Sequence, residues 1–141
     1  MKINEIMTCD VEVVRPESTV QEAAQKLKEF EIGSVPVCDG ESLVGMITDR
    51  DIAIRLAAEG KDPATVPVKR IMTPEVVWCF EDQTVEEAGR MMKENHVRRL
   101  PVISHDRRLV GILTLGDLAV RTNSLQAVGE TLQEISEAAP A

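Results

Sequence analysis

The chain contains the same segment twice. Residues 6–38 match residues 71–103 at a constant offset of 65, and residues 43–55 match residues 109–121 at an offset of 66. The additional residue falls in a polar stretch between two expected strands, where insertions are tolerated best. A repeat of this length indicates two copies of one supersecondary unit, expected to pack about a pseudo-twofold axis. Any functional site should therefore occur in two related versions.

Charge and composition exclude several classes of function. The net charge is −8 and aromatic residues make up 2% of the chain. The acidity argues against general binding to nucleic acid or anionic lipid, and few side chains could stack on single-stranded bases. No apolar run approaches the roughly 20 residues needed to cross a membrane. Residues 1–5 lack the apolar region of a signal peptide, so a cytoplasmic location is expected.

The three cysteines, Cys9, Cys38 and Cys79, are far apart in the sequence and form no Cys-x-x-Cys pair. Small buried thiols in a reducing compartment are one interpretation. One disulfide between two of them is the other, and spacing alone does not decide between the two.

Each copy is predicted to form a strand, a helix, two strands and a second helix, an α/β (α+β) unit. In the first copy these elements are expected over residues 11–14, 19–30, 34–38, 43–48 and 49–58, with Gly33 stopping the first helix. In the second copy the strands are expected near residues 76–79, 100–103 and 109–113, and the helices are expected to start at residue 84 and near residue 115. The first two strands should be parallel and the last two should form a hairpin. Because three strands cannot cover their own apolar faces, the two copies should bury their sheets against each other.

The expected division of the chain follows the repeat: motif 1 over residues 1–60, a linker over 61–70, motif 2 over 71–123 and a helical extension over 124–141. In the extension, Leu125, Val128, Leu132 and Ile135 fall at helical spacing and predict an amphipathic helix. Its apolar face either packs on its own module or forms a surface for a partner or a dimer mate. Residues 137–141 are expected to fray.

The first motif is Gly-Met-Ile-Thr-Asp-Arg-Asp over residues 45–51, echoed by Gly-Ile-Leu-Thr-Leu-Gly-Asp over 111–117. In each, an apolar strand ends at a threonine, and an aspartate follows three residues later. The simpler interpretation is a helix cap, with Thr48 and Thr114 capping and Asp51 and Asp117 in the first turn. The same residue types also suit a sugar, because a carboxylate can accept hydrogen bonds from both ribose hydroxyls.

The second motif differs between the copies. Arg98 and Arg99 precede a buried strand in the second copy, where the first copy has Gly33 and Ser34. The planar donor fork of arginine matches phosphate well. A solvated or interface pair that balances the acidic surface is the alternative.

The doubled pattern Ile-Met-Thr, Thr-Val-x-Glu-Ala, Val-Pro-Val and Leu-Val-Gly-x-x-Thr-x-x-Asp resembles a pair of cystathionine β-synthase (CBS) domains, often called a Bateman module. The resemblance covers about residues 3–122. It extends to the small stand-alone prokaryotic CBS-pair proteins of the hypoxic response protein type. It implies a disc-like, commonly dimeric module with two clefts between the repeats. In relatives, such clefts bind AMP, ADP, ATP, NAD or S-adenosylmethionine.

The resemblance also implies roles for residues. The strand-end threonine and the following aspartate would hold ribose, and basic residues before the proline of the other repeat would hold phosphate. The first cleft would then use Thr48, Arg50 and Asp51, with Arg98 and Arg99 on the phosphate. Its adenine pocket would be lined by Met46, Ile47 and Val77. The second cleft would use these: Ile112, Thr114 and Asp117, opposite Gly33 and Ser34. Without a charge at Gly33 and Ser34, the second cleft is not expected to take a polyphosphate.

Catalysis is not predicted. His96 and His105 occupy different positions in the two copies, no metal-ligand spacing is present, and no glycine-rich phosphate loop occurs. The leading hypothesis is a regulatory sensor in which an adenosine nucleotide, AMP or ATP first of all, biases the geometry of the repeats. A homodimer and a regulated protein partner would read that change. The alternative is a ligand-free adaptor or dimerisation module that acts through protein contacts.

Overall fold

A computed structural model describes residues 1–122 and 125–138 of the chain. It forms two compact units. The first-repeat unit consists of Glu12–Val76, and the second-repeat unit combines Met1–Val11 with Val77–Ala141. Each unit contains one small sheet and its own helices, which confirms the predicted α/β class.

The first-repeat unit lacks the predicted first strand, and its elements begin with the predicted helix, hairpin and second helix, in that order. They are α1 (Val20–Phe30), β1 (Ser34–Asp39), β2 (Ser42–Thr48), α2 (Asp49–Asp51), the π-helix η2 (Ile52–Ala57) that continues α2, the 3-10 helix η3 (Val68–Arg70) and β3 (Thr73–Pro74). The sheet order is β1-β2-β3, and both pairs are antiparallel. The predicted hairpin of the last two strands is therefore β1–β2.

The second-repeat unit follows the same plan and adds a helix. Its elements are the 3-10 helix η1 (Ile3–Glu5), β4 (Cys79–Phe80), α3 (Val85–Asn95), β5 (Arg99–Ile103), β6 (Leu109–Thr114), α4 (Leu115–Arg121) and α5 (Leu125–Ala138). Strand β4 pairs with β5 in parallel, as predicted for the first two strands of a copy, and β5 pairs with β6 in antiparallel.

Helices α1 and α3 begin as predicted and end differently. Thr19 caps α1 and Thr84 caps α3, each as part of a reciprocal capping box. The prediction that Gly33 stops the first helix is wrong. The helix ends at Phe30, and Glu31 adopts a left-handed conformation with φ 53° while its amide donates to the carbonyl of Leu27. A non-glycine residue closes the helix because that hydrogen bond satisfies one of the last free carbonyls.

The strand expected over residues 11–14 is reduced to a single parallel bridge between Val14 and Val37. Pro16, two residues further on, has no amide to continue the ladder. In the second copy the strand expected near 76–79 lies at Cys79–Phe80. Both copies therefore place a parallel contact beside the hairpin, although only the second builds a strand from it.

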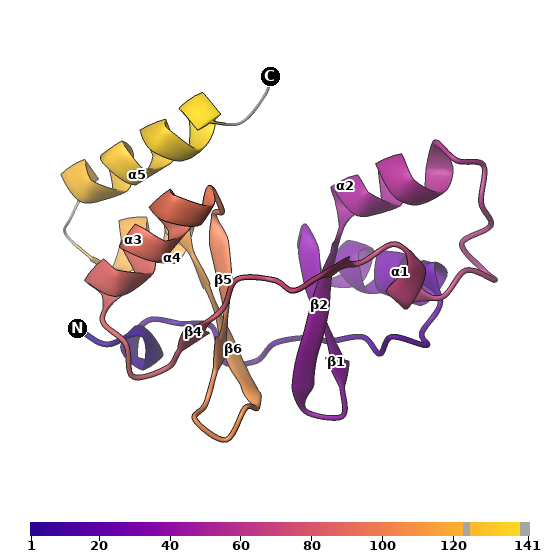
Figure 1. Ribbon diagram of the computed structural model, residues 1–141, viewed down its shortest axis with the longest axis horizontal. Helices are drawn as coiled ribbons and strands as arrows, with labels where there is room; N and C mark the ends of the chain where they lie inside the picture. Colours follow the sequence, from indigo (N-terminus) through magenta and orange to yellow (C-terminus); the bar gives the residue numbers. More distant parts are fainter. Residues whose placement is uncertain (123–124, 139–141) are drawn as a thin grey trace. The chain divides into compact units, whose positions relative to one another are not determined.

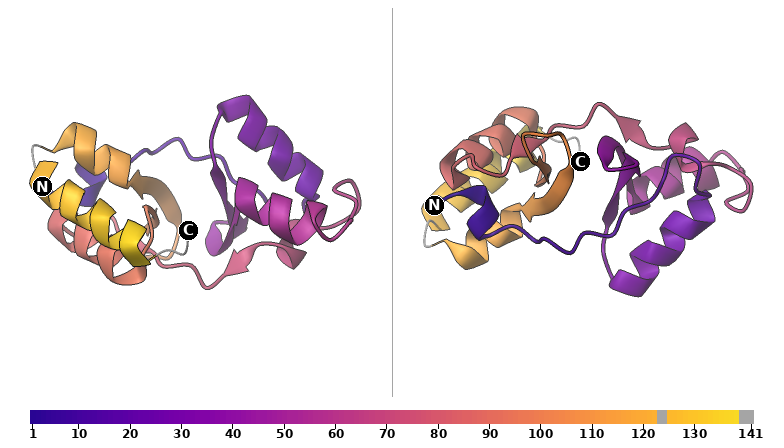
Figure 2. Two further views of the ribbon diagram at one scale, coloured as in Figure 1. Left: turned by 90° about the horizontal axis from the view of Figure 1, so that it is seen from above. Right: turned by 90° about the horizontal axis from the view of Figure 1, so that it is seen from below.

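The segment at the start of the first repeat packs in the second-repeat unit, and the segment at the start of the second repeat packs in the first-repeat unit. Ile3 and Ile6 belong to the core of the second-repeat unit, whereas Val68 and Ile71 belong to the core of the first-repeat unit. Figure 2 shows the N-terminal segment, in indigo, beside the orange and yellow elements of the second repeat. Part of the stretch 61–70, which the sequence indicates as a linker, thus supplies core residues.

Glycine in the second strand of each hairpin permits this packing. A Cβ at Gly45 would lie 2.7 Å from Sδ of Met72, and a Cβ at Gly111 would lie 2.6 Å from Sδ of Met7. The Leu-Val-Gly and Ile-Met-Thr motifs are therefore physically linked, because each glycine leaves room for one methionine.

Helix α5 confirms the predicted amphipathic extension. It lies beside α3 and α4 (Figure 1), and Ile135 and Val128 pack on the core of the second-repeat unit. Packing on its own module is therefore the interpretation that holds for these residues. Leu132 remains exposed. Of the segment expected to fray, residues 139–141 lie outside the described part of the chain.

Candidate functional site

Thr48 and Asp51 form a closed pair at the end of β2. The amide of Asp51 donates to Oγ1 of Thr48 at 3.0 Å, and the amide of Thr48 donates to Oδ2 of Asp51 at 3.0 Å. The predicted helix cap is thus present. It uses one carboxylate oxygen of Asp51 and leaves Oδ1 for another partner.

Thr114 and Asp117 repeat this geometry at the end of β6. The amide of Asp117 donates to Oγ1 of Thr114 at 3.0 Å, and the amide of Thr114 donates to Oδ2 of Asp117 at 2.9 Å. Both threonine–aspartate pairs are half-buried, and each aspartate is held in one orientation by its cap. A fixed carboxylate of this kind is suited to accept hydrogen bonds from a diol.

The carboxylate oxygen that the cap leaves free, Oδ1, has different surroundings in Asp51 and in Asp117. Oδ1 of Asp51 lies 3.8 Å from Nη1 of Arg55, and the side chain of Asp51 is only 12% exposed. The same Nη1 donates to the carbonyls of Ile71 at 3.1 Å and Met72 at 3.3 Å and to Oγ1 of Thr73 at 3.3 Å. Sequence reasoning missed the contacts of Arg55 with Ile71, Met72 and Thr73, because these partners are 16 to 18 residues away.

No corresponding ion pair holds Asp117 among residues 1–122 and 125–138. Arg121 occupies the position that corresponds to Arg55 at the offset of 66. Oδ1 of Asp117 accordingly remains available, whereas Oδ1 of Asp51 faces a cation.

The residues before each central strand lie beside the threonine of the same repeat. Ser34 pairs with Thr48 across β1 and β2, and the amide of Asp49 donates to the carbonyl of Gly33 at 3.1 Å. Gly33 and Ser34 therefore place no charge beside the first threonine.

In the second repeat the corresponding residues are arginines. Arg99 pairs with Thr114 across β5 and β6, and the amide of Leu115 donates to the carbonyl of Arg98 at 2.8 Å. The hairpin thus places Arg99 opposite Thr114 and the backbone of Arg98 beside the start of α4. This adjacency was missed from the sequence, although the hairpin register could have indicated it.

The set predicted for the first cleft is divided between the units. Thr48, Arg50 and Asp51 belong to the first-repeat unit, and Arg98 and Arg99 belong to the second-repeat unit. Their predicted proximity stays a prediction, and so does the opposition of Gly33 and Ser34 to the second set.

The residues predicted to line the adenine pocket have different environments. Ile47 is fully buried in the core of the first-repeat unit, so its side chain is occupied by packing. Met46 is its neighbour on β2 and points to the opposite face of the strand. Val77 and Ile112 are half-buried in the second-repeat unit. Ile112 also exchanges two backbone hydrogen bonds with Thr8.

The CBS domain model matches residues 3–58 and 68–121, so both repeats are covered. The chain belongs to the CBS domain family. The match includes both Thr-x-x-Asp motifs and the arginine pair, and it stops before α5.

CBS-pair proteins match this chain over most of their length. It is 41% identical to CBS domain-containing protein YhcV of Bacillus subtilis (strain 168), over 95% of this chain and 94% of the relative. It is 40% identical to hypoxic response protein 1 of Mycobacterium tuberculosis (strain CDC 1551 / Oshkosh), over 82% of this chain and 80% of the relative. The crystal structure of CBSX2 in complex with AMP is similar, with a TM-score of 0.75 and 28% identity, over 89% of this chain and 98% of that chain.

Among residues 1–122 and 125–138, the remaining reactive side chains do not assemble into a second centre. All three cysteines are free thiols; Cys38 and Cys79 are buried and Cys9 is exposed. Burial raises the pKa of the Cys79 thiol to about 12 and also raises the pKa of Cys38. Within the part of the chain that the structure describes, no group of three or more His, Cys, Asp or Glu could hold a metal ion. In the same residues, no helix has the length and apolarity to span a membrane.

Proposed function

We propose that this CBS pair is a regulatory sensor for an adenosine nucleotide, with its principal site in the second CBS repeat. Asp117 and Thr114 would hold the ribose, and Arg98 and Arg99 would hold the phosphate. The observation that carries this proposal is the register of β5 and β6, which pairs Arg99 with Thr114. Two guanidinium groups, a fixed carboxylate and a hydroxyl then come from one end of a single hairpin.

The chemistry of each group fits its proposed role. Oδ1 of Asp117 can accept from a ribose hydroxyl while Oδ2 remains engaged by the amide of Thr114. The arginines offer paired donors and positive charge to a phosphate. Arg98 is exposed and Arg99 is half-buried, so neither guanidinium is enclosed in the core. The complex of the similar protein CBSX2 with AMP supports an adenosine monophosphate as the first ligand to test.

The first repeat is proposed to hold a less charged adenosine compound or to remain empty. Gly33 and Ser34 supply no cation for phosphate beside Thr48. Arg55 lies within ion-pair distance of Asp51 and reduces the negative charge that a ribose would meet. Arg50 is exposed and is the one cation that the first repeat itself contributes to the set predicted for the first cleft.

Calorimetric titration with AMP, ADP, ATP, NAD and S-adenosylmethionine tests the proposal. Each hydrogen bond to a charged group contributes about 1.5–3 kcal/mol, so Asp117→Asn should weaken AMP binding at least tenfold or so. Replacing both Arg98 and Arg99 by Gln should have a similar effect. The control is Asp51→Asn, which should retain native affinity. Asparagine keeps an oxygen for the cap in both aspartate variants.

The control also separates two arrangements of the site. If Asp51→Asn removes AMP binding and Asp117→Asn leaves it intact, the arginines act with the opposite repeat, as the resemblance to CBS pairs implies. If none of the five compounds binds or shifts the melting temperature of the wild-type protein, the sensor is rejected. At about 100-fold over the dissociation constant a ligand should stabilise the fold by about 2.7 kcal/mol.

An adaptor or dimerisation module is the second candidate, and exposed aliphatic residues favour it. Val120 is 85% exposed and Ile54 is 47% exposed, and they occupy equivalent positions in the two repeats. Isolated apolar residues on a surface are common, but the recurrence in both repeats is suited to a repeated contact. Sedimentation of the wild type against a Val120→Lys and Ile54→Lys variant tests it. A homodimer that dissociates in this variant supports the contact, and an unchanged mass rejects it.

A further inference from the structure

Aromatic side chains gather at the tip of the β5–β6 hairpin, the end of the hairpin away from α4 (Figure 1). The chain has one Trp, two Phe and no Tyr. The ring centroids of Trp78 and Phe80 lie 5.0 Å apart with the planes at 75°, and the ring of His105 stacks on Phe80 at 4.3 Å and 17°. Cys79, between the first two, is fully buried in the core, so Trp78 and Phe80 point to the opposite side of the chain. These three rings, the tip cluster, therefore present aromatic surface outside the core.

Arg107 lies over the tip cluster. Its Cζ is 5.2 Å from the ring centroid of Trp78 and 5.8 Å from that of Phe80, within the range of cation–π contacts. Such a contact uses the face of the guanidinium and leaves its N–H donors for other partners. Among residues 1–122 and 125–138, no carboxylate forms an ion pair with Arg107 and no group accepts a hydrogen bond from its side chain. The aromatic rings thus hold a guanidinium whose hydrogen-bond donors remain available.

The backbone at Arg107 has a conformation that favours glycine. Arg107 has φ 70°, and the turn is closed by hydrogen bonds from the amide of Arg107 to the carbonyl of Ser104 at 3.0 Å and from the amide of Ser104 to the carbonyl of Arg108 at 2.9 Å. In the first repeat the left-handed position, also two residues before the second strand of the hairpin, is Gly40 with φ 62°. Glycine adopts this conformation without the steric cost that a side chain adds. Such strained positions cluster at functional sites.

The first repeat has no counterpart of the tip cluster. Val13 and Arg15 correspond to Trp78 and Phe80 at the offset of 65, and residues 39–42, which form the tip of the first hairpin, contain no aromatic side chain. The first-repeat unit nevertheless forms the same hairpin. The fold of a CBS repeat therefore does not require these aromatic residues, and their presence in one copy only indicates a separate role.

The tip carries charges of both signs, and its carboxylates are already paired. Nε2 of His105 lies 2.9 Å from both carboxylate oxygens of Asp82, and Nε of Arg108 lies 3.2 Å from Oδ2 of Asp106. Arg107 is the cation of this tip that has no such partner among the described residues. Because Asp82 and Asp106 would repel a doubly charged phosphate more strongly than a singly charged group, the site is better suited to a carboxylate.

We propose that Trp78, Phe80 and Arg107 form a docking surface for a protein partner that presents an acidic side chain beside an apolar one. The partner's carboxylate would accept hydrogen bonds from Arg107, and its apolar side chain would pack on the exposed part of Trp78. Trp and Arg are among the residue types that contribute most to the stability of protein interfaces. The surface lies at the opposite end of the hairpin from Arg99 and Thr114, so it does not depend on the proposed nucleotide site.

The test uses three capped peptides on the full-length protein at pH 7: acetyl-Leu-Glu-Leu-Glu-Leu-amide and its counterparts with glutamine or phosphoserine in place of glutamate. Trp78 is the single Trp of the chain, so its fluorescence reports directly on this surface. The glutamate peptide should change that fluorescence saturably and bind about two- to fivefold more tightly than the glutamine peptide, the range expected for an exposed ion pair. The phosphoserine peptide should bind no more tightly than the glutamate peptide. In two-dimensional NMR, the amide shifts should be confined to residues 78–82 and 104–108.

Variants at adjacent arginines locate the contact. Arg107→Gly removes the guanidinium where glycine fits the backbone, so folding should be retained, and it should abolish the preference for glutamate over glutamine. Arg107→Gln should do the same. Arg108→Gln is the matched control and should keep the preference. Trp78→Val, which installs the side chain of Val13, should weaken both peptides, as followed by NMR.

Several results would overturn the proposal. They are equal affinity for the glutamate and glutamine peptides, tighter binding of the phosphoserine peptide, a preference that survives in both Arg107 variants, and a preference lost in Arg108→Gln. Sedimentation adds one more: a wild-type assembly that dissociates in Arg107→Gly would make a second copy of the chain the occupant. Loss of AMP binding in Asp117→Asn leaves all of these measurements unaffected, so the two sites are tested separately.

Discussion

Gly111→Ala tests the close approach that joins the two ends of the CBS motif. In this variant the new Cβ would lie 2.6 Å from Sδ and 3.0 Å from Cγ of Met7, and 2.9 Å from the carbonyl oxygen of Thr8. The thioether of Met7 can rotate away. The carbonyl cannot move as easily, because it accepts from the amide of Ile112 at 3.0 Å while the amide of Thr8 donates to Ile112 at 2.9 Å.

The expected magnitude follows from two opposing effects. Overpacking a filled core costs about 1–3 kcal/mol. Replacing glycine by alanine in an extended segment restricts the unfolded chain and returns up to about 1 kcal/mol. We therefore expect Gly111→Ala to lower the free energy of unfolding by about 1–2 kcal/mol. The backbone conformation contributes nothing, because Gly111 does not have a positive φ.

Urea denaturation, followed by circular dichroism and by the fluorescence of Trp78, measures this loss. Gly89→Ala is the matched control, because its Cβ meets no atom within 4 Å. It should be neutral or up to about 1 kcal/mol more stable. Gly45→Ala should lose about as much as Gly111→Ala, since its Cβ would lie 2.9 Å from the carbonyl of Thr73.

A double-mutant cycle separates the two contacts of the new methyl group. In a Met7→Ala background the loss from Gly111→Ala should be smaller, because only the clash with the backbone remains. If Gly111→Ala is as stable as Gly89→Ala, the close approach does not constrain the fold and the reasoning is refuted.

Three further predictions concern side chains outside the nucleotide site. Arg55→Ala removes hydrogen bonds to the segment of β3 and should lower the free energy of unfolding by about 1 kcal/mol, a value reduced because the guanidinium is partly exposed. Urea denaturation measures this loss, and Arg55→Lys is the control. Exposed Cys9 should react with a thiol reagent at once at pH 7. Cys79 should react only at the rate of unfolding, because it is buried and its pKa is raised to about 12. Rapid modification of Cys79, seen by mass spectrometry, would contradict the structure. The hydrogen bond from His105 lowers the pKa of Asp82, so this pair should stabilise the fold above about pH 4 and lose its contribution as the pH falls through the lowered pKa. The free energies of unfolding of the wild type and of Asp82→Asn should therefore converge between pH 7 and pH 2. Two parallel curves would contradict this prediction.

Local patterns were sufficient for the helices and hairpins. Thr19 and Thr84 cap the predicted helices because the hydrogen bonds of a capping box lie within four residues. The same reason explains why the pairs Thr48–Asp51 and Thr114–Asp117 were identified in advance. Where a contact beyond the local pattern was needed, as for a strand over residues 11–14, the prediction was wrong.

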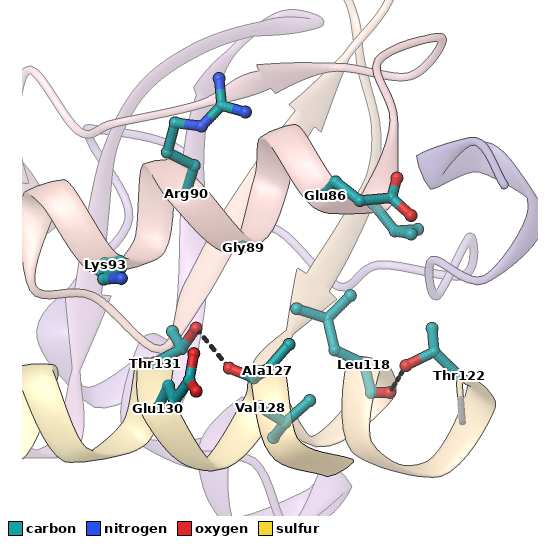
Figure 3. Close-up of a pocket in the computed structure, with 11 residues that line it drawn as sticks. Glu86, Gly89, Arg90, Lys93, Leu118, Thr122, Ala127, Val128, Glu130 and Thr131 are labelled. Atoms are coloured by element: carbon teal, nitrogen blue, oxygen red, sulfur yellow. Dashed lines mark hydrogen bonds between the residues drawn. The ribbon is translucent and has the colours of Figure 1, made fainter. Parts of the chain in front are cut away.

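The composition of the candidate site could be predicted only in part. The sequence identified Arg98 and Arg99 as the asymmetric feature of the second repeat. It did not place them beside Thr114, which depends on the pairing register of β5 and β6. It also gave no indication of the contacts between Arg55 and residues 71–73, which follow the linker, or of the pocket lined by α3, α4 and α5 (Figure 3), which exists only because α5 packs against the other two helices.

The sequence by itself determined that one α/β unit occurs twice, where its helices begin and which residues differ between the copies. Only the tertiary structure decided which copy receives each Ile-Met-Thr segment. Because Gly45 and Gly111 offer nearly the same space, the local pattern permits Met7 and Met72 to pack on either strand. The choice depends on contacts between residues distant in the chain, which no sequence period encodes, and it places Met7 on the second repeat and Met72 on the first.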